Sequence, residues 1–178
     1  MAKNSKAAFV QDGYAQVEPN HLSARRTGQI YAQLPANKEI KVLENGQFAK
    51  YDYANKEVNF TGEGEWMLVF NEVKVYGDRL GDSDFAMIRE NYGAFVYDAV
   101  GNLMPEDTVM VPRLLKTNVG DIFTTNAINE ESVAVGDVLS PNAEGFLAKS
   151  GDGSMSWKVV KVYTMPDGQP GVKVHRIA

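Results

Sequence analysis

The sequence contains no cysteine and only two histidines, His21 and His175. The absence of cysteine excludes disulfide scaffolds, thiolate nucleophiles and cysteine-ligated zinc, and it suits a reducing compartment. A histidine-based metal site or catalytic triad would have to use these two residues, which stand near opposite ends of the chain. No serine lies in a nucleophile-elbow motif, and no phosphate-binding glycine loop is present. We therefore expect a protein that is not an enzyme and that has no cofactor.

Long apolar runs are also missing. None approaches the roughly 18 residues that a membrane-spanning helix requires, and the first residues lack the apolar stretch of a secretory signal. These features predict a protein made in the cytoplasm, without a membrane partner. The net charge is −5, and after residue 36 the chain holds 14 basic against 21 acidic side chains. Such an acidic body argues against nucleic acid as a partner.

The first 36 residues have the weakest pattern. Their apolar residues are spread thinly between glycines and prolines, so the segment cannot bury a face of its own. We interpret residues 1–36 as an extended N-terminal arm that is ordered only against the body or a partner.

After residue 37 the sequence pattern becomes that of short strands. Asn45-Gly46 follows the strand-like EIKVLE, and this dipeptide is the strongest short signal for a β-hairpin. The continuous apolar stretch at 66–70 predicts a central strand covered on both faces. SDFAMIREN (83–91) predicts one short helix, with Ser83 or Asp84 as its N-cap.

The last third of the chain is dense in turns. Two alternating segments, WKVVKVYTM (157–165) and GVKVHRIA (171–178), flank a turn with two prolines and two glycines. We therefore predict an all-β fold of small barrel or sandwich modules with at most one short helix, preceded by the extended arm. The predicted parts are the arm (1–36), a β-rich domain (37–112) and a C-terminal small β-barrel-like domain (113–178).

A nine-residue phrase occurs twice in this C-terminal part, as VGDIFTTNA (119–127) and VGDVLSPNA (135–143). Glycine permits a positive φ, and aspartate bonds neighbouring backbone amides, so each Gly-Asp pair predicts a turn that enters a strand. We expect Gly120, Asp121, Gly136 and Asp137 to be structural turn residues, and the two strands to be neighbours in one barrel. The alternative is a direct role of the two aspartates in ligand binding.

An acidic loop is the weakest metal candidate. Asp78, Asp82 and Asp84 could hold a hard cation, but the loop lacks the glycine and glutamate of the calcium signature, which favours a solvated acidic loop.

Exposed aromatic residues would indicate a carbohydrate-binding β module. The candidate rows are Trp66 with Tyr51 and Tyr53, or Trp157 with Tyr163. Aromatic residues in strand-like runs more often belong to a core. An enzyme with two catalytic carboxylates is a further alternative, but no pair of acids stands out.

Two longer stretches resemble a known family. The run 116–150, KTNVGDIFTTNAINEESVAVGDVLSPNAEGFLAKS, and the run 64–87, GEWMLVFNEVKVYGDRLGDSDFAM, are similar to auxiliary capsid proteins of tailed bacteriophages, the head-decoration or head-fibre proteins. These stretches are turn-and-strand phrases without a catalytic signature, and they cover less than half of the chain.

The resemblance implies a structural protein on the outer surface of an icosahedral head, assembled in the host cytoplasm and bound to the major capsid protein. A tail or baseplate component is the alternative location. The resemblance leaves open a monomer on each capsomer and a homotrimer at a local three-fold axis. Several decoration proteins order a leading arm by strand addition to the shell. The residues that we predict for a capsid-binding arm are Phe9, Val10, Tyr14, Val17, Arg25 and Arg26.

Overall fold

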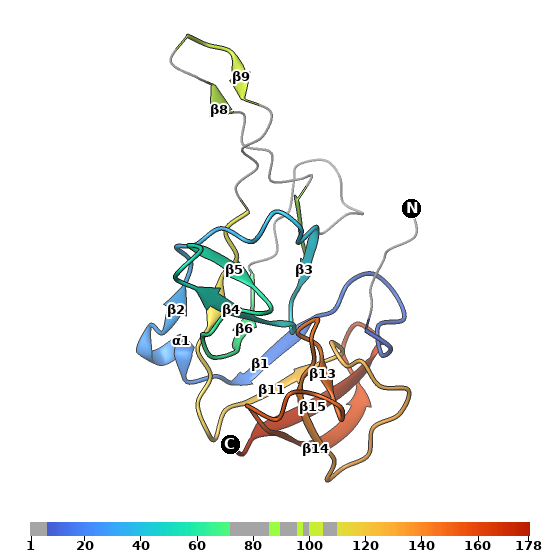
Figure 1. The fold of residues 1–178 in the computed structure, drawn as a ribbon. Coiled ribbons are helices and arrows are strands. Elements are labelled where there is room, and N and C mark those ends of the chain that lie inside the picture. Colours follow the sequence, from blue (N-terminus) through green and yellow to red (C-terminus); the bar gives the residue numbers. More distant parts are fainter. Residues whose placement is uncertain (1–6, 72–85, 90–95, 98–99, 105–109) are drawn as a thin grey trace.

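The computed structural model describes residues 7–71, 86–89, 96–97, 100–104 and 110–178 (Figure 1). Within these ranges nearly every regular element is a β-strand, and the one helix, α1 (Ala24–Thr27), has four residues. The prediction of an all-β fold with at most one short helix is confirmed.

The larger sheet has six strands. Their order is β1-β11-β15-β14-β12-β13, and every neighbouring pair is antiparallel. The bounds are β1 (Val17–His21), β11 (Ile122–Thr125), β15 (Pro170–Arg176), β14 (Trp157–Thr164), β12 (Val138–Pro141) and β13 (Leu147–Ala148). Strands β14 and β15 form a hairpin across the turn that the sequence predicts between them.

The second sheet has five strands in the order β2-β10-β6-β4-β5. The bounds are β2 (Ile30–Tyr31), β10 (Leu114–Leu115), β6 (Met67–Val69), β4 (Phe48–Asp52) and β5 (Glu57–Asn59). Strand β6 is central, and all three of its residues are buried. Leu68 packs into one core cluster, whereas Met67 and Val69 pack into another. The prediction of a central strand covered on both faces is therefore confirmed.

The two core clusters define the layers of the fold. The first lies between the two larger sheets and includes Phe48, Leu68, Phe123 and Trp157. The centre of the Trp157 ring is 4.9 Å from that of Phe123, which it meets edge-on, and 5.7 Å from that of the tilted Phe48 ring. Such aromatic contacts add to the stabilisation that burial provides. The second cluster lies between the five-stranded sheet and the strand pair β3 (Val42–Glu44) and β7 (Ala86–Ile88).

The helix predicted at 83–91 is wrong where the structure describes that segment. Residues 86–88 form β7, which pairs antiparallel with β3. Ala86 and Met87 are both buried there, so the sheet partner and the core override a weak helical pattern. The proposed N-caps Ser83 and Asp84 lie outside the described residues.

The Asn45-Gly46 pair makes a tight turn, but not the predicted hairpin. The N–H of Gln47 donates to the Glu44 carbonyl (3.2 Å), and Gly46 has a φ of 94°. The flanking strands do not pair with each other, because β3 pairs with β7 and β4 pairs with β5 and β6. The backbone of the turn forms hydrogen bonds with strand β6: the Gly46 N–H donates to the Val69 carbonyl, and the Val69 N–H donates to the Gln47 carbonyl.

The segment predicted as an arm folds onto the body from residue 7. Strand β1 joins the six-stranded sheet beside β11, and β2 joins the five-stranded sheet beside β10. Leu22 and Ala24 are buried in the first cluster. Strands from the three predicted parts of the chain therefore share sheets and a core.

A small hairpin completes the described elements. Strand β8 (Val96–Tyr97) pairs with β9 (Leu103–Met104), and Figure 1 shows this hairpin projecting from the rest of the fold. Among the described residues, no helix has the length and apolar character needed to cross a membrane.

Candidate functional site

The repeated phrase forms two turns with the same hydrogen bonds. The Asp121 N–H donates to the Asn118 carbonyl (3.0 Å), and the Asp137 N–H donates to the Ala134 carbonyl (3.1 Å). Each carboxylate accepts the backbone N–H three residues earlier, in both cases at 2.9 Å. Gly120 and Gly136 have φ values of 98° and 100°, which only glycine adopts without strain. All four residues thus occupy the predicted structural turns.

The strands that follow these turns are not neighbours, so that part of the prediction is wrong. Strands β11 and β12 belong to one sheet, but β15 and β14 lie between them. The cause is the long β14–β15 hairpin, which lies between them. Strand β11 pairs with β15, and strand β12 pairs with β14. Gly120 donates to the Arg176 carbonyl in β15, and Gly136 donates to the Val159 carbonyl in β14.

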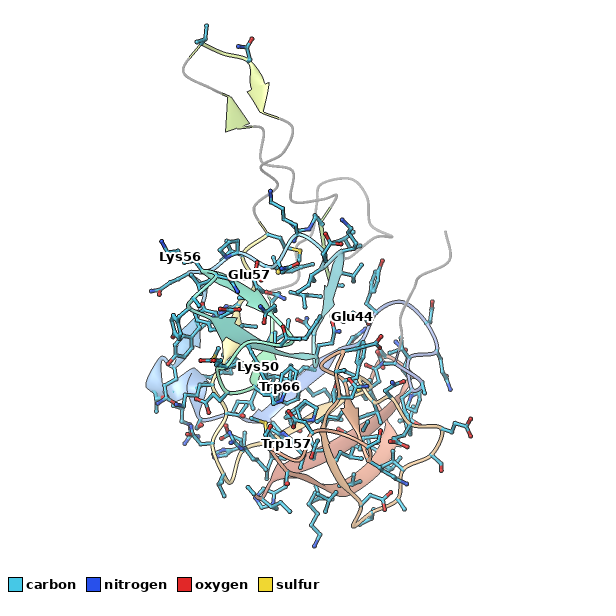
Figure 2. All side chains as sticks on the ribbon, viewed as in Figure 1. Glu44, Lys50, Lys56, Glu57, Trp66 and Trp157 are labelled. Atoms are coloured by element: carbon cyan, nitrogen blue, oxygen red, sulfur yellow. The ribbon has the colours of Figure 1, made fainter. Side chains whose placement is uncertain are left out.

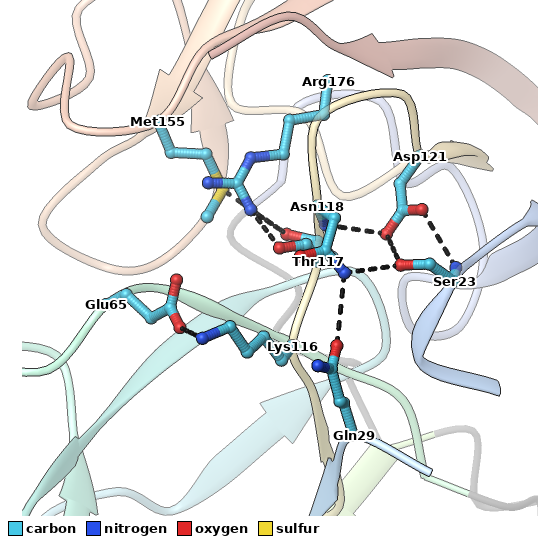
Figure 3. A network of polar contacts seen from close by, with 9 residues as sticks. All are labelled: Ser23, Gln29, Glu65, Lys116, Thr117, Asn118, Asp121, Met155 and Arg176. Carbon is cyan, nitrogen blue, oxygen red and sulfur yellow. Dashed lines mark hydrogen bonds and ion pairs between the residues drawn. The ribbon is translucent and has the colours of Figure 1, made fainter. Parts of the chain in front are cut away.

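The two aspartates differ in their surroundings, and Figure 3 shows the hydrogen bonds around Asp121. Asp121 is 2% exposed, and its carboxylate accepts hydrogen bonds from the N–H and the hydroxyl of Ser23, both at 2.9 Å. Asn118 extends this network by donating to the Ser23 hydroxyl (2.7 Å). Asp137 is more exposed and pairs with Lys149 (3.0 Å). The Ala134 N–H, with help from Lys149, holds the pKa of Asp137 below its usual value. Asp121 therefore fastens the segment before α1 to the sheet.

The outer face of the six-stranded sheet is defined as the face turned away from the first core cluster. Successive side chains of a strand point to opposite faces, so the partners of the buried positions point outward. The strand register places two rows of side chains on this face: His21, Ile122, His175, Lys158 and Val138 in one, and Glu18, Thr124, Lys173 and Lys161 in the other. The only two histidines of the chain thus lie on one face, on either side of Ile122.

A β-bulge alters the middle of this face. The register between β14 and β15 shifts between Val159 and Lys161, which leaves Val160 as the extra residue. Val160 is 39% exposed, and Val138, farther along the same face, is 46% exposed. The outer face therefore presents apolar side chains between its lysines.

Two of the three lysines on the outer face lie over an aromatic ring. The Nζ atoms of Lys161 and Lys173 lie 4.9 and 5.7 Å from the centre of the Tyr163 ring. Tyr163 donates its hydroxyl to a Glu18 carboxylate oxygen at 2.6 Å, and burial together with this carboxylate raises the pKa of Tyr163. Among the described residues, no carboxylate forms an ion pair with Lys158, Lys161 or Lys173. These three charges are available to a partner.

The apolar residues of the predicted capsid-binding arm pack against the body. Phe9 and Val17 contact the first core cluster, and Val10 contacts a third cluster that contains Ala15 and Phe146.

Buried polar groups fasten the same stretch through its backbone. The Ala15 N–H donates to the buried Glu44 carboxylate (2.5 Å), and the Gln16 N–H donates to Asn126 (2.8 Å). Tyr14 is half-buried, whereas Arg25 and Arg26 are exposed on α1.

The aromatic rows of the carbohydrate-binding alternative do not form, because both tryptophans belong to the core, as the sequence favours (Figure 2). Trp66 is 4% exposed and Trp157 is fully buried. The Trp66 indole N–H donates to Asp152 (2.6 Å), and the Lys50 Nζ lies 4.5 Å from the centre of its ring. The tryptophan-based platforms are therefore wrong.

One exposed aromatic residue borders a cavity. Tyr53 is 70% exposed and packs edge-on against Tyr51, with ring centres 5.6 Å apart. An open cavity of about 280 Å³ lies beside it, between the β4–β5 turn and the loop 61–64. The polar groups of its lining include Asp52, Asn55 and Glu63.

Within the described part of the chain, no group of three or more histidine, cysteine, aspartate or glutamate side chains could hold a metal ion. The acidic loop with Asp78, Asp82 and Asp84 lies outside the described residues.

The sequence pattern did not reveal the outer face as a site. The alternation of lysine with valine in WKVVKVY was visible, but it does not say which strands lie beside it. In comparisons with known proteins, no family model matches this chain, and neither the curated proteins nor the solved structures give a match.

Proposed function

We propose that this chain is a structural protein of a tailed-bacteriophage particle that binds the outside of the head, on the major capsid protein, and stabilises the shell. The observation that supports this proposal best is the exposed part of the outer face of the six-stranded sheet, on β12 and β14. The five-stranded sheet is packed on both faces. The outer face of the six-stranded sheet carries exposed Val138 and Val160 among lysines that have no ion-pair partner within the described part of the chain. A protein-binding surface combines exposed apolar side chains with polar and charged ones at its rim.

A shell offers the same site many times, so many copies bind to each particle. The occupancy of each site depends on the dissociation constant at that site, and a homotrimer that meets several sites at once would gain avidity. The predicted arm is a second contact in this proposal, through the exposed Arg25 and Arg26, because its apolar residues pack against the body.

The experiment is to add the purified protein to heads that lack it and to measure cosedimentation. Cryo-electron microscopy of the same particles then locates the added density and its symmetry. We expect density on the outside of the head. Density on the tail or baseplate would favour that alternative, and a protein that stays in the supernatant would contradict the proposal. The symmetry of the density distinguishes a monomer from a homotrimer.

Carbohydrate binding is the second candidate, supported by the cavity beside Tyr53. Aromatic faces stack on sugar rings, and the lining offers carboxylate and amide groups for hydroxyls. A glycan array with the wild-type protein and a Tyr53→Ala variant tests this candidate. Hits that disappear in the variant would support it, and an array without hits would exclude it.

A further inference from the structure

We infer that the outer face of the six-stranded sheet recognises an acidic protein surface through Lys158, Lys161 and Lys173, with His21 and His175 at its margin. This inference rests on the proposed function for the identity of the partner, which is the shell protein. It adds the contact face and the chemistry that the partner must present.

The three lysines come from two neighbouring strands and gather on one face: Lys158 and Lys161 lie on β14, and Lys173 lies on β15. His175 also lies on β15 and His21 on β1, and β11 lies between β1 and β15. Neighbouring strands are about 4.8 Å apart, so the set spans a patch about 15 Å wide across these four strands. Lys158 and Lys161 are exposed, and Lys173 is half-buried. A partner of matching size can therefore meet all three lysines at once.

The patch is already ordered before a partner arrives. Tyr163 is fixed by hydrogen bonds to Glu18 (2.6 Å) and Thr124 (3.0 Å), and its ring lies under the ammonium groups of Lys161 and Lys173. A cation above an aromatic ring loses less side-chain entropy on binding than a free lysine does.

The patch is positively charged, whereas the whole chain has a negative net charge. The protein has a net charge of −5, yet ion-pair partners are missing from these lysines among the described residues. An acidic partner repels most of the molecule and attracts this face, so the charges orient the encounter as well as strengthen it.

Nucleic acid fits this face less well than an acidic protein. The lysines are interrupted by Val138 and Val160, which would be placed against phosphates, and the acidic remainder of the chain opposes the phosphate backbone. An acidic protein surface offers carboxylates for the lysines and apolar atoms for the valines.

The test compares two triple variants with the same change in net charge. Lys158→Glu, Lys161→Glu and Lys173→Glu reverse the patch, and Lys38→Glu, Lys41→Glu and Lys56→Glu reverse exposed lysines of the other layers. Both proteins are added to heads that lack the protein. We expect the patch variant to bind at least about tenfold more weakly than wild type, and the control variant to bind like wild type. Wild-type binding should also weaken between about 0.05 M and about 0.5 M salt.

Control experiments distinguish a failure of this inference from a failure of the proposed function. The double variant Lys158→Glu and Lys161→Glu changes only exposed residues, and thermal unfolding checks that each variant is folded. If a folded patch variant binds heads as tightly as wild type, the inference is overturned and the proposed function stands. If wild type does not bind heads, both fail. Binding to duplex DNA, or self-association that the patch variant abolishes, would overturn an acidic shell protein as the partner.

Discussion

Asp121 and Asp137 hold the same turn in different surroundings, so they form a matched pair for mutation. Asp121→Ala would leave three donors without their acceptor: the Ser23 N–H, the Ser23 hydroxyl and the Asn118 N–H. Each buried unsatisfied group costs about 1–3 kcal/mol, and we expect Asp121→Ala to lower the free energy of unfolding by about 3 kcal/mol or more. Asp137→Ala should cost much less, because water replaces the carboxylate there. Urea unfolding measures both, and equal losses would contradict the structural role of Asp121.

Asp152 provides a test of pH dependence. Burial raises the pKa of Asp152, but hydrogen bonds from Ser154 and Trp66, with Lys50 nearby, outweigh burial and leave the pKa below its usual value of 3.8. A carboxyl whose pKa is lowered by folding stabilises the protein above its unfolded pKa, and that contribution is lost as the pH falls through the folded pKa. Wild type should therefore lose more stability than Asp152→Asn between about pH 5 and about pH 2. Urea unfolding across this range checks the difference, and parallel curves would count against it.

Local chemistry decided which residues could be predicted from the sequence. The turns at Gly120 and Gly136 depend on a φ that glycine adopts and on hydrogen bonds within four residues, so the sequence pattern suffices. The burial of Trp66 and Trp157 depends on strands far away in the chain. The sequence favoured a core position for both tryptophans, but it could not show which strands cover them.

Strand β1 is an edge strand, and its contribution to stability can be measured by truncation. Removing residues 1–6 leaves every described contact in place. Removing residues 1–24 deletes β1, takes Leu22 and Ala24 from the core, and exposes the edge of β11. We expect the longer truncation to aggregate or to lose more than about 3 kcal/mol of stability, because an unpaired edge invites association.

Thermal unfolding and sedimentation of the two truncated proteins check this expectation. A stable, monomeric protein after the longer truncation would show that residues 7–24 act as a separable arm.

Strands paired to sequence neighbours were predictable, and strands paired to distant partners were not. The β14–β15 hairpin follows from two alternating segments around one turn. The Asn45-Gly46 turn carries an equally strong hairpin signal, yet β3 pairs with β7 and β4 pairs with β6. Competition from these more distant strands also explains why 86–88 is a strand rather than part of a helix.

The whole molecule should unfold as one unit. The first core cluster joins Leu22, Phe48 and Leu68 to Phe123 and Trp157, so all three predicted parts of the chain contribute to it. A fragment of residues 113–178 would lose the partners of its aromatic core. We expect a single calorimetric transition whose enthalpy equals the van't Hoff enthalpy, and no folded state for this fragment. Two separate transitions would instead support independent domains at the predicted boundaries.

The strand order of the six-stranded sheet determines when each strand can find its partner during protein synthesis. Strand β1 leaves the ribosome about 100 residues before β11, the only strand with which it pairs in the described sheet. At typical elongation rates this interval lasts about 5–20 s, during which the first strand has no place in the sheet. Strands β14 and β15, by contrast, are separated only by the short turn between Thr164 and Pro170, so both partners of this pair are synthesised close together in time. The segment that the sequence predicts as an arm therefore has no partner strand in this sheet until β11 has been synthesised.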